Sequence, residues 1–330
     1  MVSKIDARKF TNGYNLVSSY LESKYRKEAI HRGMPLSVSI EPTTSCNLRC
    51  PECPSGLRSF TRPTGMMSDM LFNKIVDELH PYLAYMIFYF QGEPYLHKGL
   101  FDMIHYASKK GIYTATSTNG HYLSDENAKK TIESGLDRLI ISIDGADQET
   151  YESYRKGGKL DEVLEGTNRI IYWRKKLGYK KPHIIFQFLV VGPNEHQLDE
   201  INSMARKIGV DEVRFKTAQI YDYKDGSELI PKNEKYSRYI KNRAGQYEIR
   251  NTLENHCWKM WHSAVITWDG KIVPCCFDKD AQHSMGSLEH QSFRELWTGE
   301  PYNNFRAKVL KSRSEIEMCT NCTEGTKVWA

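Results

Sequence analysis

Three cysteines lie within eight residues near the front of the chain, in the stretch Cys46-Asn-Leu-Arg-Cys50-Pro-Glu-Cys53. They follow a short run, 37–41, whose β-branched and alternating residues predict a strand. Cysteine thiolates hold iron–sulfur clusters, normally four thiolates per cubane. Three would leave one iron without a protein ligand, and an open metal position is typical of a catalytic site. The spacing therefore predicts a cluster that binds something.

A zinc site is the alternative for this stretch. Structural zinc sites use two cysteines separated by two residues, completed by a second such pair. Cys50 and Cys53 would supply one pair, but Cys46 would then have no explanation. The local spacing favours the iron–sulfur interpretation over zinc.

Five more cysteines follow in the last quarter of the chain: Cys257, Cys275, Cys276, Cys319 and Cys322. The stretch 264–273 has two apolar runs around Asp-Gly, which predicts a β-hairpin. That hairpin would return Cys275 toward Cys257, and Cys319 with Cys322 would supply another pair. Four thiolates suit a cubane or a zinc ion. Cys276 is left over, either as a small apolar core residue or in place of Cys275.

Composition sets the broad class of the chain. Its 330 residues suffice for one large and one small domain, and 40% hydrophobic residues suit a soluble globular protein. No apolar run approaches a membrane span and the start has no signal-peptide core, so we expect a cytoplasmic protein away from the membrane. The net charge of +5 comes from 46 basic and 41 acidic residues. Without a basic stripe carrying aromatic residues, nucleic acid is not expected as a partner.

The elements that must position these cysteines alternate between strand and helix from residue 37 to about 218. Strands are predicted at 37–41, 85–90, 113–118, 138–143, 183–191 and 212–217. Helices are predicted near 69–80, 99–110, 124–135, 148–155, 160–177 and 195–208. This alternation indicates parallel βαβ units, and six units are too few for a closed eight-fold barrel.

The segments on either side of this region are predicted to be smaller. An amphipathic helix is expected over about 14–31, covering one end of the main domain. Its apolar side is predicted to carry Leu16, Tyr20, Leu21 and Tyr25. The polar stretch 219–256 is predicted to be a bridging segment with some helix.

The first cysteine stretch resembles the signature of the radical S-adenosylmethionine (SAM) enzymes. In that family SAM chelates the open iron through its amino and carboxylate groups. An electron from the cluster cleaves the sulfonium, and a 5′-deoxyadenosyl radical removes hydrogen from a substrate. The resemblance implies an open, partial (β/α)6 barrel related to the TIM barrel. One departure is Glu52, which stands where the family usually has an aromatic residue near the adenine.

The resemblance also implicates the end of the second strand. Gln91-Gly92-Glu93-Pro94 is similar to the Gly-Gly-Glu-Pro motif that holds the SAM amino group, with Gln91 in place of the first glycine. Glycine permits close backbone approach, and a carboxylate accepts hydrogen bonds from an ammonium group. Without the resemblance, Glu93 is interpreted as a solvated acid in a turn.

The third and fourth strands end in further polar residues. The resemblance implies that Ser117 and Asn119 lie near the SAM ribose, and that Ser142 and Arg155 bind the SAM carboxylate. Strand periodicity places Ser142 and Asp144 on one face. Without the resemblance, Asn119-Gly120 is an ordinary turn and Arg155 forms a surface ion pair.

Two residues on the last strands are candidates for the chemistry on the substrate. Gln187 is a lone amide in an apolar strand, so it either faces the barrel interior or is a hydrogen-bonded core residue. Lys216 could handle substrate charge or a proton, and its alternative is a lysine at the surface.

The back segment resembles the twitch domain, a shortened form of the SPASM extension. That resemblance implies one auxiliary [4Fe-4S] cluster, fully ligated by Cys257, Cys275, Cys319 and Cys322. We expect four tryptophans to shield the cluster: Trp258, Trp261, Trp268 and Trp297. The expected divisions are an N-terminal extension (1–36), the barrel (37–218), the bridge (219–256) and the auxiliary domain (257–330).

These resemblances imply a radical SAM enzyme that takes hydrogen from a small polar metabolite. Dehydrogenation is favoured, with the auxiliary cluster accepting an electron and a flavodoxin or ferredoxin as electron donor. A peptide-modifying enzyme that forms thioether or carbon–carbon crosslinks is the alternative. The lack of a peptide-recognition domain and the single auxiliary cluster count against it. A zinc-stabilised, non-enzymatic binding protein is the other alternative.

Overall fold

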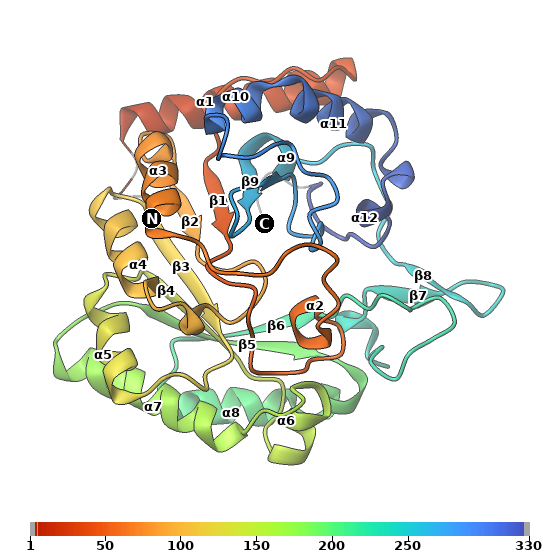
Figure 1. Cartoon of the computed structure of the whole chain (residues 1–330). Coiled ribbons are helices and arrows are strands. Elements are labelled where there is room, and N and C mark those ends of the chain that lie inside the picture. The colour runs from red at the N-terminus through yellow and green to blue at the C-terminus, as the bar shows by residue number, and fades with distance from the viewer. Residues whose placement is uncertain (1–3, 5, 327–330) are drawn as a thin grey trace.

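Figure 1 shows the computed structural model, which describes residue 4 and residues 6–326. Six parallel strands follow one another in the sheet in sequence order. They are β1 (Ser37–Ile40), β2 (Tyr85–Ile87), β3 (Tyr113–Thr118), β4 (Arg138–Ser142), β5 (His183–Val190) and β6 (Glu212–Thr217). The sheet does not close on itself, so the predicted open barrel of six units is confirmed.

Helices between the strands cover the outer face of the sheet (Figure 1). They are α3 (Asp69–Leu79), α4 (Leu100–Lys109), α5 (Asp125–Glu133), α6 (Gln148–Tyr154), α7 (Leu160–Lys176) and α8 (Leu198–Ile208). Three of them begin at a side chain that caps the first turn, namely Ser68, Ser124 and Asp147. Such caps satisfy backbone N–H groups that the helix leaves unpaired.

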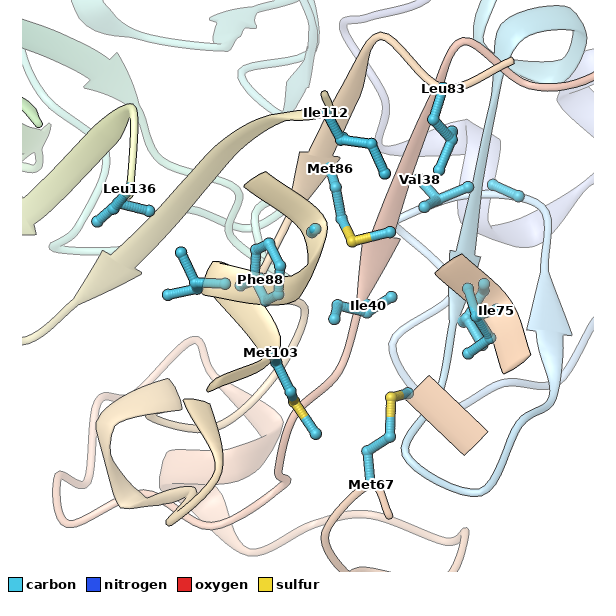
Figure 2. Packing of buried hydrophobic residues seen from close by; sticks show 14 of the residues in the cluster. Val38, Ile40, Met67, Ile75, Leu83, Met86, Phe88, Met103, Ile112 and Leu136 are labelled. Atoms are coloured by element: carbon cyan, nitrogen blue, oxygen red, sulfur yellow. The ribbon is translucent and has the colours of Figure 1, made fainter. Parts of the chain in front are cut away.

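Alternation along the strands separates the core from the barrel interior. Strand side chains that face the helices are buried, and Figure 2 shows Val38, Ile40 and Met86 beside Ile75 of α3 and Met103 of α4. The alternate residues Ser39, Ser117 and Gln187 are only half-buried. Because a strand has a period of two, these residues point to the inner side. The inner side is therefore where polar groups gather.

The C-terminal segment adds two strands to the same sheet. The predicted hairpin is confirmed as β9 (Ser263–Ile266) and β10 (Ile272–Val273), which pair antiparallel. Strand β9 also pairs in parallel with β1, so the sheet order is β10-β9-β1-β2-β3-β4-β5-β6. The hairpin thus extends the barrel sheet at its first strand. Four helices complete this segment: α9 (Lys259–His262), α10 (Phe293–Thr298), α11 (Glu300–Lys311) and α12 (Glu317–Thr320).

The first helix, α1 (Ala7–Arg26), begins earlier and ends earlier than predicted. Leu16 and Tyr20 are buried as expected, and the Tyr20 ring packs on Trp261 of α9. Leu21 and Tyr25 were placed wrongly on this face, since Tyr25 is 90% exposed. The buried face instead uses small polar residues such as Ser19 and Ser23, which hydrophobic periodicity cannot detect.

The bridging segment, predicted to hold some helix, contains a pair of short strands in addition to a 3-10 helix at Glu234–Tyr236. A short α2 (Pro54–Leu57) follows the first cysteines, whereas 219–256 holds the antiparallel pair β7 (Tyr239–Lys241) and β8 (Tyr247–Ile249) and one 3-10 turn. Asn242 closes the hairpin by accepting the backbone N–H groups of Ala244 and Gln246. Asx turns of this kind favour a hairpin over a helix.

Within the described residues, none of the helices has the length and apolar character needed to cross a membrane.

Candidate active site and second cysteine site

The first three cysteines line a cavity of about 190 Å³ at the carboxyl ends of the strands. Of the residues predicted to contact SAM, six lie on its wall: Gly92, Glu93, Ser117, Asn119, Ser142 and Arg155. Residues from three strand ends and from the turn after α6 thus surround the three thiols. The described wall offers neither a cysteine nor a histidine as a fourth ligand.

Each of the three thiols also touches a polar side chain from a different motif. These contacts, all at 3.9 Å, pair Asn119 with Cys46, Arg155 with Cys50 and Gln91 with Cys53. Gln91 is not part of the cavity wall and joins the site through its contact with Sγ of Cys53. Polar groups next to cluster sulfurs orient the ligands and tune the cluster potential. The structure therefore brings all seven predicted cofactor residues to one site.

Glu93 is buried, so its interpretation as a solvated acid is wrong. Only 2% of the residue is exposed. Its carboxylate accepts hydrogen bonds from Thr118 Oγ1 at 2.8 Å, Asn119 N at 2.7 Å and Tyr95 N at 3.2 Å. Burial raises the pKa of Glu93 to about 7 even though these donors lower it. A buried carboxylate on a cavity wall favours a cationic ligand.

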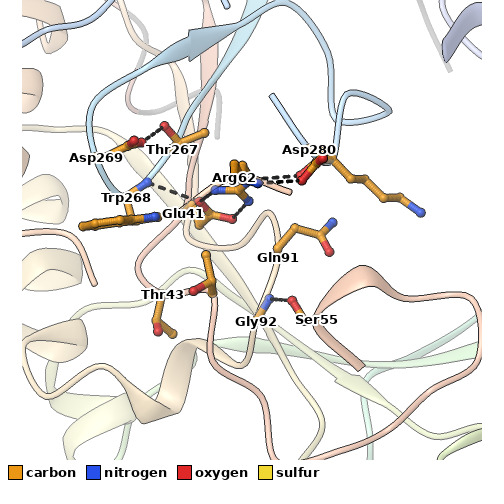
Figure 3. A network of polar contacts seen from close by, with 12 residues as sticks. Glu41, Thr43, Ser55, Arg62, Gln91, Gly92, Thr267, Trp268, Asp269 and Asp280 are labelled. Atoms are coloured by element: carbon orange, nitrogen blue, oxygen red, sulfur yellow. Dashed lines mark hydrogen bonds and ion pairs between the residues drawn. The ribbon is translucent and has the colours of Figure 1, made fainter. Parts of the chain in front are cut away.

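Gly92 allows the chain to pass close to the cysteine loop. Its φ is +75°, and a Cβ there would lie 2.2 Å from the carbonyl oxygen of Thr43. Its N–H donates to Ser55 Oγ at 2.9 Å, as Figure 3 shows. A side chain would push this turn away from the thiols, so glycine is required for the observed approach.

Arg155 is held by an acid that sequence reasoning did not assign to the site. Its Nε lies 2.5 Å from Oδ2 of Asp144, which is fully buried. The other carboxylate oxygen of Asp144 accepts the N–H of Leu189 at 2.7 Å. The interpretation of Arg155 as part of a surface ion pair is therefore wrong. Asp144 holds the guanidinium of Arg155, whose Nη1 contacts Sγ of Cys50. The signal in the sequence was an acid at the end of a strand, shortly before an arginine.

Gln187 and Lys216 lie on the inner side of the barrel. Gln187 pairs with Ser142 across β4 and β5, and Lys216 pairs with Leu189 across β5 and β6. Leu189 and Ser142 line the three-cysteine cavity, whereas Gln187 and Lys216 do not. Gln187 is half-buried and Lys216 is exposed on this side. Both candidates therefore face the interior beside the cavity.

A buried ion pair joins the base of the cysteine loop to the C-terminal hairpin. Glu41, directly after β1, receives two hydrogen bonds from Arg62, at 2.6 and 2.8 Å. It also accepts the N–H of Trp268 at 3.2 Å, as Figure 3 shows. The backbone of Arg62 in turn donates to Asp280. This network fixes the two segments together, and no local pattern in the sequence indicated it.

The other cysteines line a second cavity, as predicted. Its wall holds all four expected ligands: Cys257, Cys275, Cys319 and Cys322. Cys276 is exposed and lies outside this wall, so its interpretation as a small core residue is wrong. Arg313 also lines the cavity and donates to the carbonyl oxygens of His256 and Glu324.

The tryptophans do not shield this cavity, contrary to expectation. None of the four lines it. Trp261 and Trp297 are fully buried and donate to the carbonyl oxygens of Ile30 and Gly33, so they fill the core beneath the N-terminal segment. Trp268 packs over Gly65. Met260, Phe277, Val309 and Met318 supply the apolar wall instead.

A third cavity, of about 390 Å³, has wall residues in common with both cysteine sites. It shares Tyr89 and Phe90 with the three-cysteine cavity, and Lys259, Cys275 and Glu324 with the four-cysteine cavity. Its volume lies in the range of small-molecule sites, roughly 300–1,000 Å³. A molecule bound there would contact the walls of both cysteine sites.

Both cysteine sites fit an iron–sulfur cluster. Burial raises the pKa of Cys46 and of Cys319 to about 11, so ligation must remove protons from buried thiols. Among the described residues, no three His, Cys, Asp or Glu side chains converge closely enough for a single metal ion. Three thiols at the first site and four at the second are donor sets that iron–sulfur clusters use.

The fold and the two sites define a class: open α/β barrels with a three-cysteine cluster loop after the first strand. The sequence profile of the Radical SAM superfamily matches residues 40–208, about half of the chain. The chain belongs to the Radical SAM superfamily. A second profile, described as an iron–sulfur cluster-binding domain and named SPASM, matches residues 257–323. Membership implies SAM and a [4Fe-4S] cluster, and the second domain implies auxiliary cluster binding.

Several characterised proteins are similar over most of the chain. A Pyrococcus furiosus protein named tungsten-containing aldehyde ferredoxin oxidoreductase cofactor-modifying protein is 27% identical over 318 residues, covering 86% of each chain. PqqA peptide cyclase of Bradyrhizobium diazoefficiens is 23% identical, covering 91% of this chain and 81% of that protein. The crystal structure of BtrN in complex with AdoMet and 2-DOIA has a TM-score of 0.54 at 15% identity, covering 89% and 95%. This last likeness shows a shared fold.

Proposed function

We propose that this radical SAM enzyme oxidises a small polar metabolite by dehydrogenation. The observation that carries the proposal is the interior cavity, because its wall includes residues of both cysteine sites. A substrate in that cavity can give a hydrogen atom toward one site and an electron toward the other. The similarity to a protein named for modifying a cofactor also favours a substrate other than a peptide.

The first cavity is proposed to hold SAM on the three-cysteine cluster. In the family, SAM bound in this way supplies a radical that takes a hydrogen atom from the substrate. Glu93 would accept the ammonium group of SAM, because its buried carboxylate has no cationic side chain bonded to it in the described structure. Arg155 and Ser142 would bind the SAM carboxylate, with Asp144 holding the guanidinium in place. Ser117 and Asn119 would contact the ribose.

The remaining residues are proposed to act on the substrate. Dehydrogenation removes a hydrogen atom, a proton and an electron from the same molecule. Gln187 and Lys216 face the interior and would hold polar groups of the substrate there. A cluster whose four ligands are Cys257, Cys275, Cys319 and Cys322 has no free position for substrate, so electron transfer suits it. A flavodoxin or ferredoxin would supply the electron that starts each cycle.

Anaerobic reconstitution followed by product analysis tests this function. The loaded protein should contain about eight iron atoms per chain, four for each cubane. Candidate metabolites would be added with a reductant, and 5′-deoxyadenosine and product would be followed by mass spectrometry. We expect one product, lighter by two hydrogens, per 5′-deoxyadenosine. A product that keeps all its hydrogens would contradict dehydrogenation.

Peptide modification is the second candidate function. Similarity to a peptide cyclase favours it, as does an open groove of about 460 Å³ beside the first cysteine loop. The groove is lined by aromatic side chains, including Tyr221, Tyr223 and Phe277, which could hold an extended chain. A small peptide encoded next to this gene, and crosslinked by the purified enzyme, would establish this alternative.

A further inference from the structure

Two residues of the bridging segment, Ile220 and Tyr221, connect the two cysteine loops. On one side, the N–H of Tyr221 donates to Oε2 of Glu52 at 2.9 Å. On the other side, Nδ2 of Asn321 donates to the carbonyl oxygen of Ile220 at 2.8 Å. Glu52 lies between Cys50 and Cys53, and Asn321 lies between Cys319 and Cys322. A peptide unit is thus bonded to the interior of both loops.

The hydroxyl of Tyr239 forms hydrogen bonds with both Ile220 and Asn321. It accepts the N–H of Ile220 at 2.8 Å and lies 2.9 Å from Oδ1 of Asn321, to which it donates. Tyr239 and Ile220 are 2% and 1% exposed. The bond from the Ile220 N–H to the Tyr239 hydroxyl is buried, so breaking it would leave polar groups unpaired, whereas the Tyr221–Glu52 bond is exposed.

We propose that Glu52, Tyr239 and Asn321 are positioning residues that couple the two cysteine loops through residues 220–221. Side chains behind metal ligands orient those ligands, and a site loses function when its supporting residues are loose. Here the supporting residues of both loops share one peptide unit. Displacing either loop should therefore displace the other.

This coupling is separate from the Glu41 network described above. Glu41 and Arg62 join the base of the first loop to the β9–β10 hairpin, whereas Glu52 and Asn321 sit within the loops that carry the cysteines. The coupling also gives Glu52 a role in this chain, at the position where the family usually has an aromatic residue. It holds whichever substrate the enzyme takes, so its test does not depend on the proposed function.

Hydrogen exchange in the reconstituted holoenzyme tests the coupling. Glu52→Ala removes the acceptor for Tyr221 N–H, and we expect faster exchange both at 219–223 and in the remote peptide 317–323. Loss of one net hydrogen bond corresponds to up to about tenfold in opening. Glu52→Gln keeps an acceptor oxygen and should restore slow exchange in both peptides. Glu248→Ala, an exposed carboxylate of the same bridging segment, is the matched control and should change neither.

A second variant removes the hydrogen bonds that Tyr239 makes with Ile220 and Asn321. Tyr239→Phe removes one hydroxyl with little change in volume, so it provides the test even where Glu52→Ala loses iron. We expect it to speed exchange at 317–323 and in the first loop, 46–58. We also expect a shift in the midpoint potentials of both clusters, followed by electron paramagnetic resonance during redox titration. Faster exchange confined to residues next to each substitution, with both potentials unchanged, would overturn the coupling.

Discussion

The two cysteine sites are built in opposite ways. The first draws its thiols from eight consecutive residues after β1, and side chains from other strands and from the turn after α6 complete its wall. The second collects its thiols from three distant segments: before α9, after β10 and around α12. A short loop can leave one side open to the barrel, whereas three converging segments surround their cavity. This difference agrees with the proposal that the first site binds SAM and the second holds only its cluster.

The arginines beside the thiols repeat this difference. Arg155 is held by the side chain of Asp144 and still lines the first cavity. The two Nη atoms of Arg313 donate to backbone carbonyl oxygens of Glu254, His256 and Glu324, so Arg313 ties chain segments together around the second cavity. Arg155 therefore remains on the wall of a cavity that could take a ligand, whereas Arg313 joins segments of the backbone.

Removing the thiols of one site at a time is expected to have the largest effect. Replacing Cys46, Cys50 and Cys53 with alanine should abolish SAM cleavage and keep about half of the iron, because the second site has its own ligands. Replacing Cys319 and Cys322 should also remove about half of the iron but leave reductant-driven SAM cleavage. Iron analysis and 5′-deoxyadenosine release give both readouts. SAM cleavage by the first variant would contradict the division of roles.

Replacing Arg155 sharpens the contrast between the arginines. Arg155→Ala should weaken SAM binding and destabilise the protein by about 3–5 kcal/mol, because it leaves the buried Asp144 carboxylate without its partner. Adding Asp144→Asn in the same chain should recover much of the stability but not the SAM affinity. Urea unfolding and equilibrium binding of SAM measure the two effects. An unaltered SAM affinity would show that Arg155 does not bind SAM.

The cysteine spacing identified the first loop because that signal is local, and parallel strands bring their carboxyl ends to one edge. The roles of Glu93, Ser142 and Arg155 came from the family resemblance, since local patterns alone favoured a solvated acid and a surface ion pair. Asp144, Glu41 and Arg62 were missed because their partners are fixed only by tertiary packing. The pairing of β9 with β1 was missed for the same reason: a hairpin pattern identifies its own two strands but not the third strand that one of them joins.

A glycine at each site provides the next comparison. A Cβ on Gly92 would lie 2.2 Å from the backbone oxygen of Thr43, whereas one on Gly325 would lie 2.3 Å from Sγ of Cys257. Gly92→Ala should therefore cost about 3 kcal/mol of unfolding free energy and weaken SAM binding. Gly325→Ala should instead lower iron retention at the second site. Equal effects of both variants on SAM binding would contradict the separate roles given to these two glycines.

The smallest expected effect is a difference in pH dependence between two carboxylates. Burial raises the pKa of Glu93 to about 7. Folding of the SAM-free protein therefore loses stability as pH rises from about 4.5 through 7, by at most roughly 3 kcal/mol for this group. Glu93→Gln should be more stable than the parent at pH 8, yet bind SAM more weakly, because the amide lacks the charge that an ammonium group needs. Urea unfolding at pH 5 and pH 8 measures the first effect.

Glu324, at the second site, should show the opposite sign. Burial raises its pKa, but the neighbouring Lys259 ammonium lowers it more, so the net pKa is below the ordinary value. Its contribution to stability is present above the ordinary carboxylate range and is lost as pH falls below about 4.5. Glu324→Gln should therefore show no gain in stability at pH 8. If Glu324→Gln raised the stability at pH 8 as much as Glu93→Gln does, the Lys259 ammonium would not be stabilising the Glu324 carboxylate. The contrast expected here is that Glu324 already has its cation, whereas Glu93 receives one only when SAM binds.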